Sequence, residues 1–128
     1  MRFCYYNANP LNRRVNDCTV RAISLATNQT WDNTYIMLSE FARLQCIMPD
    51  EVYYIDEFLN NNFIKICGCK ERGRRITVGE FVDRNPKGTF LITMNGHITC
   101  CVDGCIYDTF NPEDRIVWGV YQVEKRRD

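Results

Sequence analysis

A cysteine and the single histidine of the chain are the residues best suited to catalysis. Cys18 follows Asn16 and Asp17, two favoured helix N-cap residues, and precedes apolar residues at helical spacing. In the first turn of a helix, free N–H groups and the helix dipole stabilise a thiolate. Such a nucleophile needs a base, and His97 is the available one. The pair predicts nucleophilic thiol chemistry; the alternative is a buried inert cysteine and an ordinary turn histidine.

An acidic residue, Asp108, completes a possible triad. The turn signals at 95–96 and 103–104 separate segments of alternating polarity and predict antiparallel strands. With a two-residue turn at 103–104, His97 and Asp108 share one face of the sheet as diagonal neighbours, about 7–8 Å apart between backbones. An acid placed there can orient an imidazole and stabilise its protonated form. The alternative is a strand-end acid that bonds to the next turn.

Helices precede an antiparallel meander in the expected order of elements. Four helices are expected: 18–27, 31–44, a stretch that opens at 49–50 and closes at 60–62, and a short capped helix from Thr77 to before Pro86. The expected strands are 3–7 at an edge, 63–67, 89–94, 97–102, 105–109 and 116–123. A loop is expected around Gly68 and Gly73. Asp17 and Arg21 stand four residues apart and support the first helix. The apolar stripe of the second helix, formed by Trp31, Tyr35, Leu38 and Phe41, is predicted to face the core. The class is α+β, with helices on one face of a sheet.

Composition and charge narrow the possible functions. The 128 residues fit a single domain, 1–128, and the 16 basic and 16 acidic residues cancel, so no nucleic-acid partner is expected. Basic clusters at 13–14, 72–75 and 125–127 are predicted to be solvated. The first residues form no long apolar run, so we expect neither a signal peptide nor a membrane anchor, and a cytoplasmic location. The eight cysteines are then expected to be reduced thiols.

A zinc site is the alternative use of these cysteines. The candidate ligands are Cys67, Cys69, Cys100, Cys101 and Cys105. Their spacing does not repeat the pairs found in structural zinc sites, and Cys100 and Cys101 would point to opposite faces of a strand. We therefore expect no metal and no other cofactor.

Two motifs resemble the compact papain-like cysteine peptidases. They are Asn-Asp-Cys-x-x-Arg-Ala at 16–22 and Gly-His-Ile-x-x-x-Val-Asp-Gly-x-Ile-x-Asp-Thr at 96–109. The similarity spans about residues 12–121; it is greatest to the short forms encoded by bacteriophages and bacteria, and more distant to the peptidase domains of bacteriocin exporters. It implies a papain-like fold with N-terminal helices packed on a C-terminal antiparallel sheet, a peptide or protein substrate and, for a phage-encoded protein, the host cytoplasm.

The resemblance also implies roles for individual residues. Cys18 matches the nucleophile, His97 the general base and Asp108 the orienting acid. Many papain-like enzymes use an asparagine in the third role, which makes Asn111 the fallback. The implied activity is that of a thiol acyl hydrolase acting on a peptide or isopeptide-type bond. Release of the acyl group by water or by a second nucleophile is left open.

The oxyanion site is a further implication. In the family, a glutamine six residues before the nucleophile donates to the oxyanion together with the nucleophile's own backbone N–H. Here that position holds Asn12, one methylene shorter, and Asn16 is the second candidate. The alternative function is a catalytically inactive papain-like protein that binds a host or viral protein, because one fold can host unrelated functions.

Overall fold

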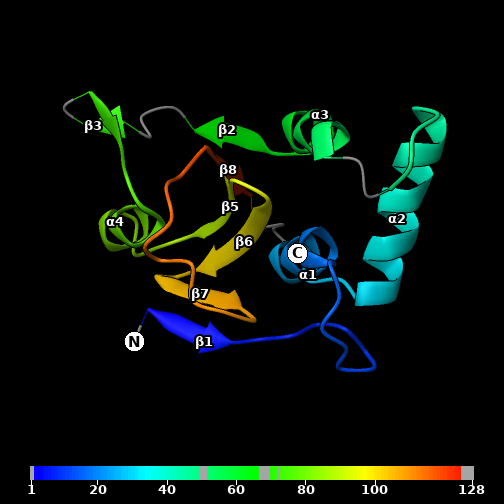
Figure 1. Cartoon of the computed structure of the whole chain (residues 1–128), viewed down its shortest axis with the longest axis horizontal. Helices are drawn as coiled ribbons and strands as arrows, with labels where there is room; N and C mark the ends of the chain where they lie inside the picture. Colours follow the sequence, from blue (N-terminus) through cyan, green and yellow to red (C-terminus); the bar gives the residue numbers. More distant parts are fainter. Residues whose placement is uncertain (1, 50–51, 67–69, 72, 125–128) are drawn as a thin grey trace.

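A six-stranded sheet forms the centre of the computed structural model, whose described residues are 2–49, 52–66, 70–71 and 73–124 (Figure 1). In sheet order the strands are β1 (Phe3–Tyr5), β7 (Cys105–Asp108), β6 (His97–Val102), β5 (Thr89–Met94), β8 (Gly119–Val123) and β2 (Ile64–Ile66). All neighbouring pairs are antiparallel except β1 and β7, so the expected antiparallel sheet is in fact mixed. Parallel pairing needs a long connection, and the helices lie between these two strands in the chain.

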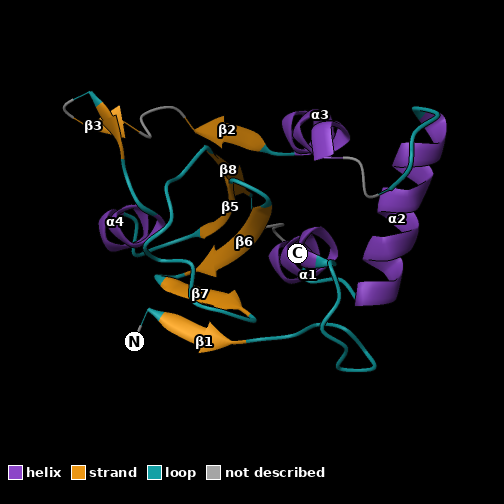
Figure 2. Ribbon diagram, viewed as in Figure 1, coloured by secondary structure: helices purple, strands orange, loops and turns teal. Residues whose placement is uncertain are grey.

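Helices cover both faces of the sheet (Figure 2). Those in the described residues are α1 (Cys18–Thr27), α2 (Trp31–Leu44), α3 (Val52–Asn62) and α4 (Val78–Arg84). The expectation of helices on one face is wrong, because α4 packs on the face opposite to α1, α2 and α3. The cause is visible in β5: Leu91 packs with α1 to α3, whereas its neighbours Phe90 and Ile92 pack with α4. A central strand that is apolar on both faces needs cover on both.

Local signals set the helix boundaries. The predicted bounds of α1 and α2 are confirmed, and the Thr30 side chain accepts a hydrogen bond from the Asn33 N–H at the start of α2. The short helix α4 begins with a capping box in which Thr77 and Glu80 bond reciprocally. The predicted opening of the third helix includes residues 50–51, which lie outside the described residues.

Two tight turns fix the register of the central hairpins. At Asp103 and Gly104 both φ angles are positive, 47° and 81°, as a type I′ turn requires. At the other turn only Gly96 has a positive φ, 71°, so the two-residue loop predicted at 95–96 is present but is not of type I′. The predicted pairing of β6 with β7 is confirmed.

Smaller differences occur at the periphery. Part of the region expected to be a loop forms a short hairpin of β3 (Lys70–Glu71) and β4 (Arg74–Arg75). The last strand, β8, begins at Gly119 rather than at 116, because Ile116 instead forms an isolated bridge with Thr77. Among the helices described, none is long and apolar enough to cross a membrane.

Candidate active site

The start of α1 places the Cys18 thiol beside the sheet. The first bond of the helix runs from the Arg21 N–H to the Asp17 carbonyl, over 2.9 Å. Asp17 occupies the N-cap position, but its side chain makes no capping hydrogen bond, which corrects the expected capping role. Its carboxylate instead accepts hydrogen bonds from Arg21 Nε at 2.8 Å and Trp31 Nε1 at 2.9 Å. This carboxylate therefore does not occupy the N–H groups of the first turn, where an anion is favoured.

The structure brings His97 and Asp108 together. His97 is the first residue of β6 and Asp108 the last of β7, and their side chains are joined by a hydrogen bond of 2.6 Å between Nε2 and Oδ2. The exposed fractions of the two side chains are 7% and 2%. The second oxygen, Oδ1, accepts the Thr109 backbone N–H at 2.7 Å. The ring of Phe110 lies against the imidazole, with 4.6 Å between ring centroids.

The Cys18 thiol lies close enough to the same imidazole for a hydrogen bond with His97 to lower the pKa of the thiol. Because His97 Nε2 bonds Asp108, we infer that the Cys18 sulfur faces Nδ1. The sulfur also accepts the backbone N–H of Ile98. In the observed register Ile98 would pair with Thr109, but β7 ends at Asp108. This early end of β7 leaves the N–H of Ile98 available to the thiol.

Electrostatics favour a thiolate–imidazolium pair. Burial by itself raises the pKa of Cys18, but the hydrogen bonds from His97 and Ile98 and the charge of Arg21 lower it, and the net shift is downward. Burial by itself lowers the pKa of His97, but the hydrogen bonds with Asp108 and Cys18 raise it to about 9. Both shifts favour the charged forms, a thiolate on Cys18 and an imidazolium on His97.

An apolar cleft of about 550 Å³ opens at Cys18 and His97. Its aromatic wall is formed by Trp31 and Tyr35, whose rings stack with 5.1 Å between centroids and 16° between planes. These two residues were expected in the core; of that stripe only Leu38 and Phe41 pack there. The other lining residues are Val15, Asn16, Asp17, Thr19, Val20, Leu38, Ser39, Met48, Pro49, Ile55, Asp56, Thr93, Met94, Gly96, Ile98 and Trp118.

The asparagine candidates lie at different places. Asn12 is exposed, has a φ of 53° and closes a turn with Asn9, and it does not line the cleft. Asn16 does line it, two residues before the thiol. Of the two asparagines, Asn16 is therefore the one that lies at the cleft. The Asn111 side chain accepts the Glu113 N–H at 3.2 Å, while Asp108 holds the position beside the imidazole.

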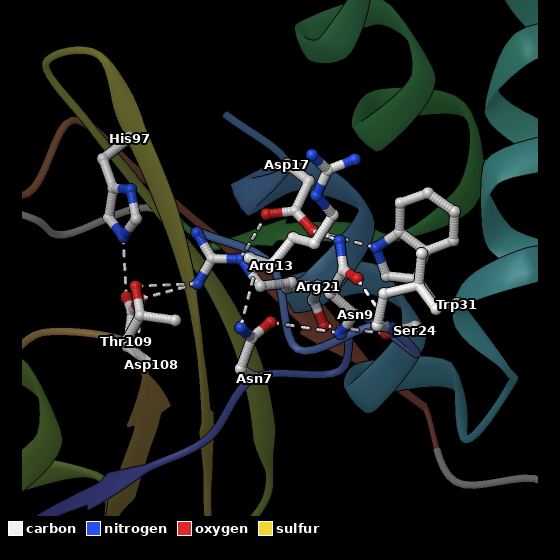
Figure 3. Close-up of polar contacts among 11 residues, drawn as sticks. Asn7, Asn9, Arg13, Asp17, Arg21, Ser24, Trp31, His97, Asp108 and Thr109 are labelled. Carbon is white, nitrogen blue, oxygen red and sulfur yellow. Dashed lines mark hydrogen bonds and ion pairs between the residues drawn. The ribbon is translucent and has the colours of Figure 1, made fainter. Parts of the chain in front are cut away.

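Arg21 is the residue that sequence reasoning missed. It was interpreted only as a helix-supporting partner of Asp17, but its Nη1 also bonds Asp108 Oδ1 at 3.2 Å and Thr109 Oγ1 at 3.1 Å (Figure 3). Arg21 stands one helical turn after Cys18 and therefore on the same face of α1. A charged residue on the face of α1 that also carries Cys18 was the sequence signal that could have indicated these contacts.

No group of three or more side chains in the described residues could hold a metal ion. Cys67 and Cys69 lie outside that part of the chain. Cys100 and Cys101 are buried in two different clusters on opposite faces of the sheet, as strand alternation requires.

Comparison with known proteins gave no relative: no family model, no curated protein and no solved structure matches the chain.

Proposed function

We propose that the chain is a papain-like cysteine peptidase, or a related thiol acyl hydrolase, that acts on a peptide or isopeptide-type bond. Cys18 is the nucleophile, His97 the acid–base residue and Asp108 the acid that orients it. The observation that carries the proposal is a buried imidazole that bonds a carboxylate and lies beside a thiol whose pKa it lowers, at an apolar cleft.

The chemistry is acyl transfer. The Cys18 thiolate attacks the carbonyl carbon of the substrate, and the oxyanion accepts hydrogen bonds from the Cys18 backbone N–H and the Asn16 amide. His97 gives its proton to the leaving amine as the C–N bond breaks, which leaves a thioester. A water molecule then attacks the thioester while His97 takes its proton, and the acid leaves with the thiolate restored. Asp108 keeps the imidazole in place throughout.

The cleft suits an extended peptide with bulky apolar side chains. Trp118 and Met48 expose 56% and 63% of their surface at its rim, and Trp31 and Tyr35 form its wall. Apolar and aromatic surface around a few polar groups is typical of ligand sites. A partner protein that covers this rim without being cleaved is the second candidate, and the same exposed residues favour it.

Selective alkylation tests the thiol. We expect iodoacetamide near pH 6, with mass-spectrometric mapping, to modify Cys18 ahead of the other cysteines, because its pKa is lowered. The exposed Cys4 and Cys46 control for simple accessibility. Cys101, whose pKa burial raises to about 11, should stay unmodified. Faster labelling of Cys46 than of Cys18 would overturn the proposal.

Hydrolysis separates the two candidate functions. A quenched-fluorescence peptide library rich in apolar residues should be cleaved by the protein and not by Cys18→Ala, with the circular dichroism of the two proteins equal. Cys46→Ala is the matched control and should cleave normally, because Cys46 is exposed and is not among the residues that line the cleft. A reactive Cys18 that cleaves no member of the library, in a protein that binds one, would support the binding function instead.

A further inference from the structure

We propose that Arg21 is a positioning residue of the site: its buried guanidinium bridges Asp108 and Asp17, and so ties the acid beside His97 to the wall of the cleft. The catalytic role of Arg21 rests on the proposed function. The test measures only the reactivity of the Cys18 thiol and does not require peptide hydrolysis.

The bridge consists of short contacts between buried groups. Arg21 Nε bonds Asp17 Oδ1 at 2.8 Å, and Nη1 bonds Asp108 Oδ1 at 3.2 Å (Figure 3). The side chains of Arg21, Asp17 and Asp108 expose 10%, 7% and 2% of their surface. A planar guanidinium can hold two carboxylates at a fixed separation, which a flexible ammonium cannot do.

The contacts divide the two oxygens of Asp108. Arg21 and the Thr109 N–H both bond Oδ1, which leaves Oδ2 for His97. A carboxylate held at one oxygen by two donors cannot rotate away from the imidazole without breaking both bonds. Arg21 and the Thr109 N–H together hold the carboxylate with its free oxygen toward His97.

The other end of the bridge reaches the cleft. Asp17 Oδ2 accepts hydrogen bonds from Trp31 Nε1 at 2.9 Å and from Asn9 Nδ2 at 3.3 Å. Trp31 stacks on Tyr35 in the aromatic wall. The wall that contacts a substrate and the acid beside His97 are therefore joined through one arginine.

The charges of Arg21 and Asp17 predict the direction in which each substitution should shift the pKa of the Cys18 thiol. Arg21 is the cation that α1 adds near Cys18, where its charge lowers the pKa of the thiol, and Asp17 at the N-cap of α1 is the anion paired with it. Among the described residues, the other charged and titratable groups around the thiol are His97 and Asp108 on the strands, Asp56 on α3 and Tyr35 on α2. Removing the cation should raise the pKa of the thiol, and removing the anion should lower it.

The test is the pH at which alkylation of Cys18 is half-maximal. Arg21→Gln should move it upward, with a loss of about three- to tenfold in the rate near pH 6, where tenfold corresponds to one pKa unit. Asp17→Asn should move it downward. Arg21→Lys keeps the charge but cannot hold both carboxylates, so its half-maximal pH should lie between those of the parent protein and Arg21→Gln. Arg43→Gln, at an exposed arginine of α2, is the matched control and should move nothing.

Opposite shifts in Arg21→Gln and Asp17→Asn would support the inference. If Arg21→Gln does not fold, the downward shift in Asp17→Asn and the smaller upward shift in Arg21→Lys carry the same test. Variants that melt earlier but keep the parent half-maximal pH would overturn the inference and leave Arg21 a structural residue. An absence of peptide hydrolysis would count against the proposed function and would not affect this measurement.

Discussion

Replacing Asp108 by asparagine removes one negative charge beside His97 and keeps the size of the side chain. The carboxylate is the first partner that raises the pKa of His97 to about 9 against the lowering effect of burial. At pH 8 a group with that pKa is about 90% protonated, whereas a histidine with an ordinary pKa of about 6.5 is about 3% protonated. Asp108→Asn can therefore deplete the imidazolium up to about thirtyfold at pH 8.

The pH dependence of Cys18 alkylation should report the loss of the imidazolium. Without a firmly protonated partner the pKa of Cys18 rises, so the pH of half-maximal alkylation by iodoacetamide should move upward. Asp103→Asn is the matched control, because Asp103 sits in the turn between β6 and β7 and bonds the Gly88 N–H rather than the imidazole. Identical alkylation profiles for the parent protein and Asp108→Asn, or equal shifts in both variants, would refute the reasoning.

Three further predictions follow from the structure. Peptide hydrolysis should fall as the pH rises through about 9, because His97 then loses the proton that the leaving amine needs; a rate still rising at pH 10 would contradict this. Trp118→Ala should raise KM without changing Cys18 alkylation, since Trp118 lines the cleft and is 56% exposed; an unchanged KM would exclude it from substrate binding. Thr77→Ala should lower the free energy of unfolding by about 1 kcal/mol in a denaturant titration, because the α4 cap is lost. The alkylation profile of Thr77→Ala should not move.

Local rules were sufficient to predict the neighbourhood of His97. The turn at 103–104 fixes the register, and strand alternation then places His97 and Asp108 on one face, which the structure reproduces. The start of α1 at Cys18 was equally local, since it follows from residue types within one turn. Such features depend on near neighbours in the chain, and a single sequence contains them.

Contacts between distant segments were not predictable in the same way. The sequence shows Asp17 and Arg21 as a helical pair, yet Arg21 also reaches Asp108, 87 residues away. The position of Asn12 depends on a turn that directs it away from the cleft, and spacing from Cys18 alone could not show that turn. Such placements are set by packing between elements, which single-sequence patterns do not specify.

The end of β7 connects these observations. Strand alternation assigns His97 and Asp108 to the face that α4 covers, whereas Cys18 belongs to α1 on the opposite face. Groups on opposite faces of a continuous sheet could not touch. Because β7 stops at Asp108, no ladder pair with β7 is formed by the first residues of β6, and at that place Arg21 bonds Asp108 and the pKa of Cys18 is lowered by His97 and Ile98. One more pair of ladder bonds there would occupy the Ile98 N–H and separate the Cys18 thiol from His97. The arrangement of the three side chains therefore depends on the residue at which β7 ends.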